Sequence, residues 1–325
     1  MTRIKTSKWP AALFAGLAAV LLSSAASAKN IKITTVDCSD PEQTLAGALS
    51  TIPLHFVNEI HFTGTCGEDL DIGLDYVALI GDGFSSTIEG HVWIGGANNV
   101  SLDGFNLTVD DGDTGVQASM GASVRITDVT INGGEEAGAE TIGIQVLNGS
   151  AARIQNVHVT VAGIDAAALV VSNGAMARLR GGSTFEAILV LDPEEENVAI
   201  EVADASSLHQ GGDEDVIIGG MNIISNSYVR MRDVNITGNI GINRHSGLRL
   251  RDDSAGNTVV GDVRILRDSY AFLEGRSNGR SVVITGDVVC FDTESSLQLD
   301  TRRGDVNYAD TDCTNFNQPE PESSE

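Results

Sequence analysis

The sequence has little positive charge. It contains 20 lysine and arginine residues against 45 aspartate and glutamate residues in a chain of 325. Such a chain repels the phosphate backbone and lacks the attraction that drives non-specific nucleic-acid binding. We therefore expect neither nucleic acid nor an anionic membrane surface among its partners. The simplest use of this acidity is to keep an exported protein soluble.

Long apolar runs are also missing, apart from one near the N-terminus. This run, residues 11–22, follows the basic residues of segment 3–8 and precedes the small residues 26–28. This pattern predicts a signal peptide over residues 1–28, cleaved after Ala28. No later segment approaches the roughly 20 apolar residues of a membrane helix. The sequence thus predicts a secreted or periplasmic chain without a membrane span. Its remaining 17 basic and 45 acidic residues give a formal charge of −28.

The four cysteines contain no Cys-x-x-Cys pair, and no histidine stands beside one. This argues against zinc. In an oxidising compartment we expect disulfides instead. Four cysteines allow three pairings. The spacing favours Cys38–Cys66 and Cys290–Cys313, because each pair flanks one end of the repetitive region.

Helical spacing of apolar residues is absent from that region, which is built on a short repeated motif. Clear copies are Val124–Ile131, Ala152–Val159 and Val229–Ile236. Weaker copies begin at Val77, Val100, Ala177, Ser207, Leu248, Ala271 and Leu297. The mean interval is about 24 residues, which is typical of a stacked solenoid rather than of a propeller blade.

Within a copy, apolar residues alternate on both sides of a break at the fifth position. Alternating β-branched residues predict two short strands joined by a turn. The fifth position holds residues that tolerate left-handed backbone angles, which we place at Asp103, Asp128, Asn156, Gly181, Gly211, Asp233 and Asp252. The pattern predicts an all-β fold, a single-stranded parallel β-helix of about ten coils.

Both ends carry capping signals. The segment 39–42 resembles a helix start, with Pro41 in the first turn. Leu45, Leu49 and Ile52 give the following residues one apolar face, so we predict a short capping helix from Pro41 to about Ser50. Three domains result: the signal peptide 1–28, the β-helix 29–316 and a disordered acidic tail 317–325.

On these motifs, and on Gly64-Thr65-Cys66 before the first coils, the chain resembles the pectin-lyase-like right-handed parallel β-helix superfamily. It looks most like secreted bacterial right-handed β-helix repeat proteins. The resemblance implies right-handed coils, which general crossover handedness also favours. It does not imply one activity, because a fold hosts many functions.

Known catalytic motifs on this fold do not match. The Arg-x-Pro-x-x-Arg segment of pectate lyases and the Gly-His-Gly of polygalacturonases are both missing from the sequence. The segment 192–195 (Asp-Pro-Glu-Glu) resembles the Asp-Pro-His-Asp of alginate-acting epimerases, but glutamate replaces the histidine that would serve as a base. We interpret this segment as a solvated acidic loop.

The candidate ligand-binding residues are arginines at the second and fourth motif positions. They are Arg125, Arg153, Arg178, Arg230, Arg249 and, at the fourth position, Arg180, Arg232 and Arg251. Strand alternation turns them outward on one face. Guanidinium forks suit carboxylates and sulfates, so a row of them fits an acidic polysaccharide. The alternative is that they pair with acidic residues of adjacent coils, for instance Glu201, Asp204 or Glu274.

Other candidate sites are less specific. The acidic clusters 110–113 and 213–215 offer oxygen ligands for calcium, although neither follows a known calcium motif. No histidine stands in a nucleophile motif. The sequence therefore favours a non-catalytic β-helix that presents its face to an acidic polysaccharide or a surface protein, with no cofactor. Two alternatives remain: a polysaccharide lyase or epimerase that uses a base such as His158 or His245, and a purely structural or adhesin role.

Overall fold

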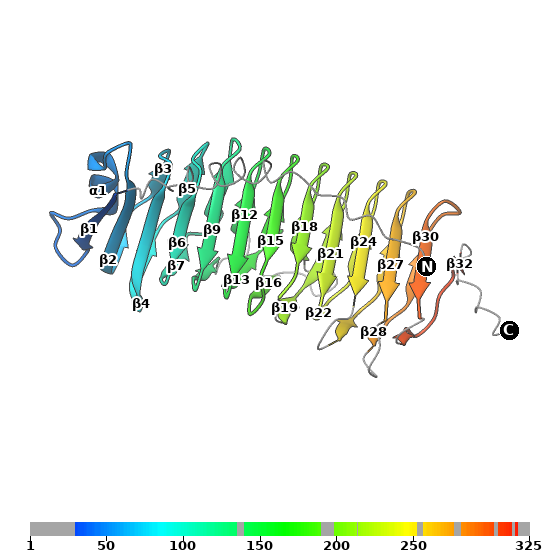
Figure 1. Cartoon of the computed structure of the whole chain (residues 1–325). Helices are drawn as coiled ribbons and strands as arrows, with labels where there is room; N and C mark the ends of the chain where they lie inside the picture. Colours follow the sequence, from blue (N-terminus) through cyan, green and yellow to red (C-terminus); the bar gives the residue numbers. More distant parts are fainter. Residues whose placement is uncertain are drawn as a thin grey trace, which may run out of the picture.

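The chain forms an elongated stack of parallel β-coils, seen from its side in Figure 1. The computed structural model describes residues 30–134, 140–189, 198–212, 214–251, 256–275, 281–301, 305–313 and 316–317. The predicted signal peptide, the acidic segment 192–195, Asp252 and residues 318–325 lie outside this range. Asn317, the first residue of the predicted tail, belongs to the last strand.

Each coil has three strand positions, which recur along the stack. First-position strands are β1 (Ile31–Asp37), β2 (Val57–Gly67), β4 (Val77–Glu89), β6 (Val100–Asp103), β9 (Ser123–Thr127), β12 (Ala151–Gln155), β15 (Met176–Leu179), β18 (Ser207–Gln210), β21 (Tyr228–Arg232), β24 (Gly247–Arg251), β27 (Tyr270–Glu274), β30 (Ser296–Asp300) and β32 (Phe316–Asn317). Second-position strands are β7 (Asn106–Val109), β10 (Thr130–Gly133), β13 (His158–Gly163), β16 (Thr184–Leu189), β19 (Asp215–Ile218), β22 (Val234–Thr237), β25 (Asn257–Val260), β28 (Val282–Ile284) and β31 (Val306–Asn307). Strands β2 and β4 run through both positions.

The third position completes the coil. Its strands are β3 (Leu70–Ile72), β5 (Val92–Gly95), β8 (Thr114–Ser119), β11 (Ile142–Val146), β14 (Ala167–Val171), β17 (Val198–Val202), β20 (Gly220–Ile223), β23 (Ile240–Ile242), β26 (Val263–Ile265) and β29 (Val288–Cys290). First- and second-position strands form one 22-stranded sheet, and the third-position strands form a 10-stranded sheet. The predicted parallel β-solenoid of about ten coils is confirmed, with coil 1 starting at β2 and coil 7 at β18.

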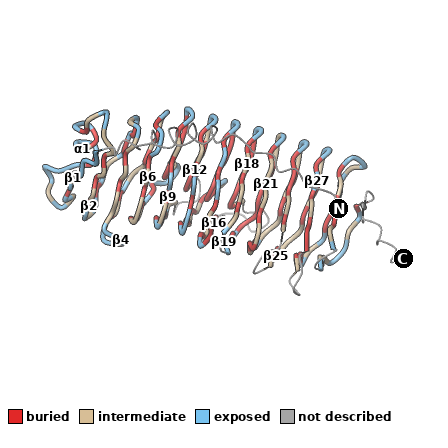
Figure 2. The backbone as a smooth tube through the Cα atoms, viewed as in Figure 1, coloured by how far each residue is buried: buried red, intermediate tan, exposed pale blue. Residues whose placement is uncertain are grey.

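The core is a continuous stack of aliphatic side chains inside the coils. Val124, Ile126, Val129 and Ile131 of one copy are all buried, as are their counterparts in the coils above and below. Buried and less buried residues alternate along the strands in Figure 2. Because neighbouring strands lie about 4.8 Å apart, each apolar side chain rests on its equivalent in the next coil. The ladder of arginines predicted from the sequence is therefore held outside a rigid core.

The corner between first and second strands has the predicted left-handed residues. The φ angle is positive at Asp128 (53°), Asn156 (51°) and Asp233 (49°). Two of the assigned corner residues were wrong by one position. Asp103 pairs with Thr127 at the end of β6, so that Gly104 takes the corner. Gly211 is likewise followed by the true corner residue, Gly212, with φ 154°.

The second error comes from the copy assigned to Ser207. Strand pairing aligns Leu208 with Ala177 on one side and with Val229 on the other, so this copy starts one residue later than predicted. Leu208 is the inward residue because only it can fill the apolar stack, whereas Ser207 stays partly exposed. The shift moves His209 to the second motif position, in line with the arginines.

A column of buried serines links coils 6 to 10, which include six of the eight arginines of the predicted row. From coil 6 to coil 9, the backbone N–H that precedes the first-position strand donates to the serine hydroxyl of the next coil. These bonds are Ala175 N to Ser206 Oγ (3.1 Å), Ser206 N to Ser227 Oγ (3.3 Å), Ser227 N to Ser246 Oγ (3.2 Å) and Ser246 N to Ser269 Oγ (3.2 Å). Buried backbone groups require such partners, so this column fixes the spacing of the outward residues that follow it.

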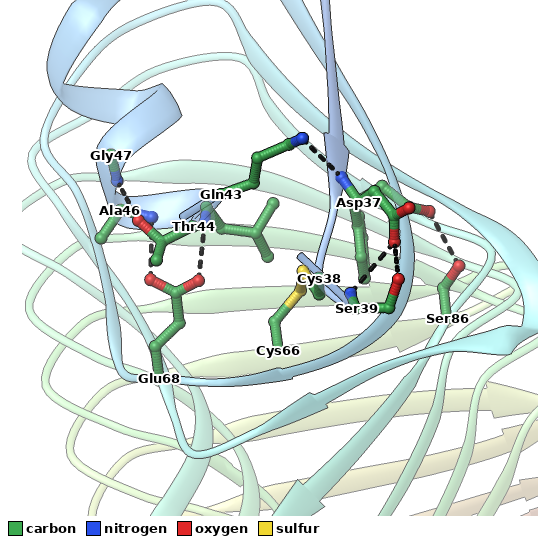
Figure 3. Close-up of a disulfide and its surroundings, with 12 residues drawn as sticks. Asp37, Cys38, Ser39, Gln43, Thr44, Ala46, Gly47, Cys66, Glu68 and Ser86 are labelled. Carbon is green, nitrogen blue, oxygen red and sulfur yellow. Dashed lines mark hydrogen bonds between the residues drawn. A yellow bond between two sulfur atoms is a disulfide. The ribbon is translucent and has the colours of Figure 1, made fainter. Parts of the chain in front are cut away.

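The N-terminal cap is a helix, but it begins later than predicted. Helix α1 spans Leu45–Thr51, and Thr44 is its N-cap, accepting from Gly47 N at 2.9 Å. The Asp40 carboxylate instead accepts from Glu42 N and Gln43 Nε2, which folds the residues around Pro41 into a turn. Glu68, from the first coil, accepts from Leu45 N and Ala46 N (Figure 3). The predicted apolar face is confirmed by the burial of Leu45, Leu49 and Ile52.

Both predicted disulfides are formed. Cys38 is bonded to Cys66 beneath the cap (Figure 3), and Cys290 is bonded to Cys313 at the other end. Cys38 directly follows β1 and Cys66 lies in β2, so the first bridge fastens the capping segment to coil 1. Two structural disulfides agree with an oxidising compartment such as the periplasm or the exterior. No helix in the described part of the chain is long and apolar enough to cross a membrane.

Candidate functional site

The outward residues of the first-position strands form two parallel columns. The second motif position gives Ser101, Arg125, Arg153, Arg178, His209, Arg230, Arg249 and Phe272, in that order along the stack. The fourth position gives Asp103, Thr127, Gln155, Arg180, Gly211, Arg232, Arg251, Glu274 and Asp300. We call the eight arginines of these columns the arginine ladder. It runs over strands β9 to β24, from green to yellow in Figure 1.

The structure thus brings all predicted arginines onto one face. Arg153 is registered with both Arg125 and Arg178, and Arg230 with Arg249. What the sequence reasoning missed is His209, which stands between Arg178 and Arg230. The corrected start of its motif copy at Leu208 was the signal that could have found it.

At its C-terminal end, the arginine ladder forms ion pairs with a carboxylate. Arg249 Nη2 lies 2.6 Å from Glu274 Oε2, and Arg251 Nε lies 3.8 Å from Glu274 Oε1. Glu274 itself is almost fully buried. Here the predicted pairing with acidic residues of adjacent coils is correct. Glu201 cannot take this role, because it lies on β17 in the other sheet.

The middle of the ladder is different. Within the described part of the chain, Arg125, Arg153, Arg178, Arg180 and Arg230 form no ion pair. The Nε atoms of Arg180 and Arg230 are buried without a hydrogen-bond acceptor. Two unit charges one strand apart repel by about 0.9 kcal/mol in water. A chain with so many acidic residues thus holds a run of arginines on one face that form no ion pair with the described residues.

Burial and this crowding lower the pKa of several side chains on the face. Burial, and then the neighbouring charges of Arg178 and Arg153, lowers the pKa of Arg180. Burial, followed by Arg232 and Arg249, does the same to the pKa of Arg230. The pKa of His209 is also lowered, by burial first and then by Arg230 and Arg178. His209 therefore stands neutral among arginines at neutral pH, with a ring N–H available as a donor.

A pocket of about 540 Å³ opens on this face at coil 7. Its lining includes Arg178 and Arg180 from coil 6, His209 and Gly211 from coil 7, and Arg230 and Arg232 from coil 8. An aromatic side chain contacts one of these lining residues. The ring of Tyr228 meets His209 edge to face, with centroids 6.1 Å apart.

Further aromatic side chains lie on the same face toward the C-terminal end. The guanidinium of Arg249 lies over the ring of Phe272, 5.0 Å from its centroid. The ring of Tyr270 covers Gly247 so closely that a Cβ there would lie 2.4 Å from it. Flat aromatic surfaces beside arginine forks combine an apolar contact area with charged donors.

The remaining candidate residues do not assemble a second site. His158 is exposed on β13, a second-position strand, away from the ladder strands. His245 contacts Asp268 at 3.1 Å, but it lies in the turn before β24 rather than on the ladder face. Neither therefore meets the requirement for a base beside the ladder. His209 does lie on that face, and no hydrogen bond from its ring to a described carboxylate is formed.

The acidic clusters likewise show no gathering of ligands. Asp215 is buried and accepts from Ser183 N at 2.9 Å, which turns it away from the loop surface. Residue 213 lies outside the described residues. Among those described, no group of three or more His, Cys, Asp or Glu side chains is placed to hold a metal ion. Calcium binding stays untested.

Comparison with known proteins gives little further information. No family model matches the chain. No curated protein matches it either. Among solved structures, a polygalacturonase from Erwinia carotovora ssp. carotovora is similar over 89% of this chain and 96% of its own, with 10% identity and a TM-score of 0.29. A likeness this low carries no conclusion about activity, and the fold rests on the strand pairing described above.

Proposed function

We propose that this chain is an exported, non-catalytic β-helix that binds an acidic polysaccharide along its arginine ladder. The observation that carries this proposal is the run of Arg125, Arg153, Arg178, Arg180 and Arg230, which form no ion pair with the described residues, on the face of an otherwise acidic chain. Bound carboxylates or sulfates relieve the mutual repulsion of these groups and supply their missing partners.

A regular polymer fits this face better than an irregular surface. The five steps from Arg125 to Arg249 span about 24 Å at the spacing of parallel strands. The ladder therefore repeats like a polymer with evenly spaced anionic groups. Carboxylates bound the ladder, with Asp103 before it and Glu274 and Asp300 after it. We therefore expect each protein molecule to bind a short stretch of polysaccharide along its arginine ladder.

The test is affinity electrophoresis through gels that contain polygalacturonate or alginate at low salt. The triple variant Arg125→Gln, Arg153→Gln, Arg230→Gln should bind these polymers roughly 10- to 100-fold more weakly, since each exposed pair contributes about 0.2–1 kcal/mol or somewhat more. Raised salt should lower the affinity of the wild type for these polymers toward that of the variant, because salt screens exposed charges.

A matched control removes equal charge elsewhere. Arg264 lies on β26 of the other sheet, where it pairs with Asp262, and Arg244 and Arg267 lie in turns. The triple variant Arg244→Gln, Arg264→Gln, Arg267→Gln should keep wild-type retardation. Equal losses in both triple variants would mean that the polymers respond to net charge and not to the ladder. The release of unsaturated ends from uronate polymers, followed by ultraviolet absorbance, would instead favour the lyase alternative.

The histidine in the ladder makes binding depend on pH. Its ring faces Arg178 and Arg180 of β15 and its loop, and Tyr228, Arg230 and Arg232 of β21. Since its pKa is lowered from 6.5 in the free protein, a bound polyanion raises that pKa again and proton uptake accompanies binding. Affinity should increase a few-fold as the pH falls from 7.5 to 5. In the His209→Gln variant, binding titrations should show an affinity that does not change over this pH range. If the variant keeps the pH dependence of the wild type, His209 is not the group responsible.

The stability of the unliganded protein should change with pH in the direction opposite to its affinity for the polymer. A histidine with a lowered pKa stays neutral in the folded state while the unfolded chain takes up a proton below about pH 6.5. The unliganded protein should therefore lose some stability as the pH falls through that range. His209→Gln should remove this part of the loss in denaturant titrations.

A further inference from the structure

The arginine ladder is interrupted at coil 7 in both of its columns. His209 stands where the neighbouring coils have Arg178 and Arg230. Gly211 follows Gln210, the partner of Leu179, and so stands between Arg180 and Arg232. The arginines on either side are two strand spacings apart, about 9.6 Å. The interruption thus leaves a gap with guanidinium groups on two opposite walls.

Gly211 is not required by the backbone or by packing. Its φ is not positive, so its conformation is open to any residue. A Cβ at this position would meet no atom within 4 Å. The next residue provides the contrast, since Gly212 has φ 154° and a Cβ there would lie 2.0 Å from the carbonyl oxygen of Arg180. Structure explains the second glycine but not the first, whose effect is to leave the pocket open.

The walls of this pocket are rich in unused donors. Arg178, Arg180 and Arg230 make no ion pair with any described residue, and the Nε atoms of Arg180 and Arg230 lack an acceptor. Among the described lining residues, the one carboxylate is that of Asp233, which is only 2% exposed and accepts from Gly256 N. The described lining of the pocket therefore has donors on both sides and a single, buried carboxylate.

We propose that this pocket is a subsite for a tetrahedral oxyanion, specifically a sulfate ester carried by the bound polysaccharide. The proposal rests on the proposed function, because the polymer that carries the ester lies along the ladder. A planar carboxylate offers two oxygens in one plane and matches a single guanidinium fork. A sulfate ester has three terminal oxygens that point in different directions. It can accept from Arg178 and Arg180 on one wall and from Arg230 on the other, with His209 below.

The experiment adds one arginine at either of two places in the fourth-position column. Gly211→Arg fills the pocket, whereas Gln155→Arg extends the ladder at an exposed position one coil before Arg180. Both changes add the same charge to the same face. The probes are dextran sulfate oligosaccharides and oligogalacturonates of equal length, titrated by calorimetry at fixed salt.

We expect Gln155→Arg to tighten binding of both probes about two- to three-fold, as one more exposed pair would. Gly211→Arg should tighten oligogalacturonate similarly but weaken the sulfated probe at least about five-fold. If Gly211→Arg tightens the sulfated probe as much as Gln155→Arg does, the pocket is not a subsite, although the ladder still binds polyanions. If the wild type binds neither probe, the proposed function fails as well.

Titration with inorganic sulfate shows whether the pocket binds a sulfate ester on the polymer or a free ion. The wild type should bind the sulfated oligosaccharide at least about ten-fold more tightly than inorganic sulfate, and Arg125→Gln with Arg153→Gln should weaken only the oligosaccharide. Equal affinity for the two, unaffected by that double variant, would assign the pocket to a free oxyanion and overturn the polysaccharide ester as its occupant.

Discussion

Replacing Gly212 with alanine is expected to destabilise the protein by about 4 kcal/mol, whereas the same change at Gly211 should shift stability by less than about 0.5 kcal/mol. Gly212 has φ 154°, where a side chain is strained, and its added Cβ would lie 2.0 Å from the Arg180 oxygen. That oxygen belongs to the backbone of the preceding coil and cannot swing away. Gly211 has neither restriction.

The two neighbouring variants are compared by denaturant titration followed by circular dichroism. Because the two changes are one position apart in the same loop, the variants have the same composition. A stable Gly212→Ala variant would mean that the corner of coil 7 can relax. It would also weaken the use of these glycines to define the pocket. A destabilised Gly211→Ala variant would give that glycine a structural role and remove one step from the case for the sulfate subsite.

The repeat was sufficient to predict the fold because its signal is physical and redundant. Ten coils each require inward aliphatic residues and a left-handed corner, so an error in one copy leaves the pattern intact. The copy at coil 7 was assigned to start at Ser207, one residue too early. In this coil no arginine follows the first inward residue, Leu208, so the sequence has no marker for the start of the motif. Strand pairing with β15 and β21 resolved this ambiguity.

Features that depend on distant residues were not accessible from local patterns. The start of α1 was misplaced because Asp40 and Pro41 form a plausible helix start in isolation. In the structure, Thr44 caps the helix while Glu68, 23 residues after Leu45, accepts its first N–H groups. No local rule connects these residues, since the contact exists only after β2 has formed.

The pairing of the arginines shows the same limit. Glu274 was one of three acidic residues considered as partners, and it is the one that contacts Arg249 and Arg251. Its register with Arg251 follows from the pairing of β24 with β27. Glu201 instead lies on a third-position strand, which faces away from the ladder. The composition offers more acidic residues than arginines as partners, but only the register decides which arginines remain available to a ligand.

Removal of the first disulfide, by Cys38→Ala with Cys66→Ala, is expected to cost about 3.5 kcal/mol in stability. The two cysteines are 28 residues apart, and closing a loop of that size restricts the unfolded chain by this amount. The bridge also fastens the segment that carries α1 to coil 1. Once it is broken, Leu45 and Leu49 can leave the end of the core, which exposes the first strands to solvent and to edge pairing.

The second disulfide provides the matched comparison. Cys290 and Cys313 are 23 residues apart, so the same relation gives nearly the same cost, about 3.5 kcal/mol, for Cys290→Ala with Cys313→Ala. Any excess loss in the first variant, measured by denaturant titration, therefore reports the cap and not the closed loop. Hydrogen exchange should show faster exchange in β2 and β4 for the first variant, while strands β12 to β21 stay protected. Equal losses, with exchange unchanged at β2, would mean that α1 remains docked through its apolar face and its bonds to Glu68 alone, and that the bridge acts only on the unfolded chain.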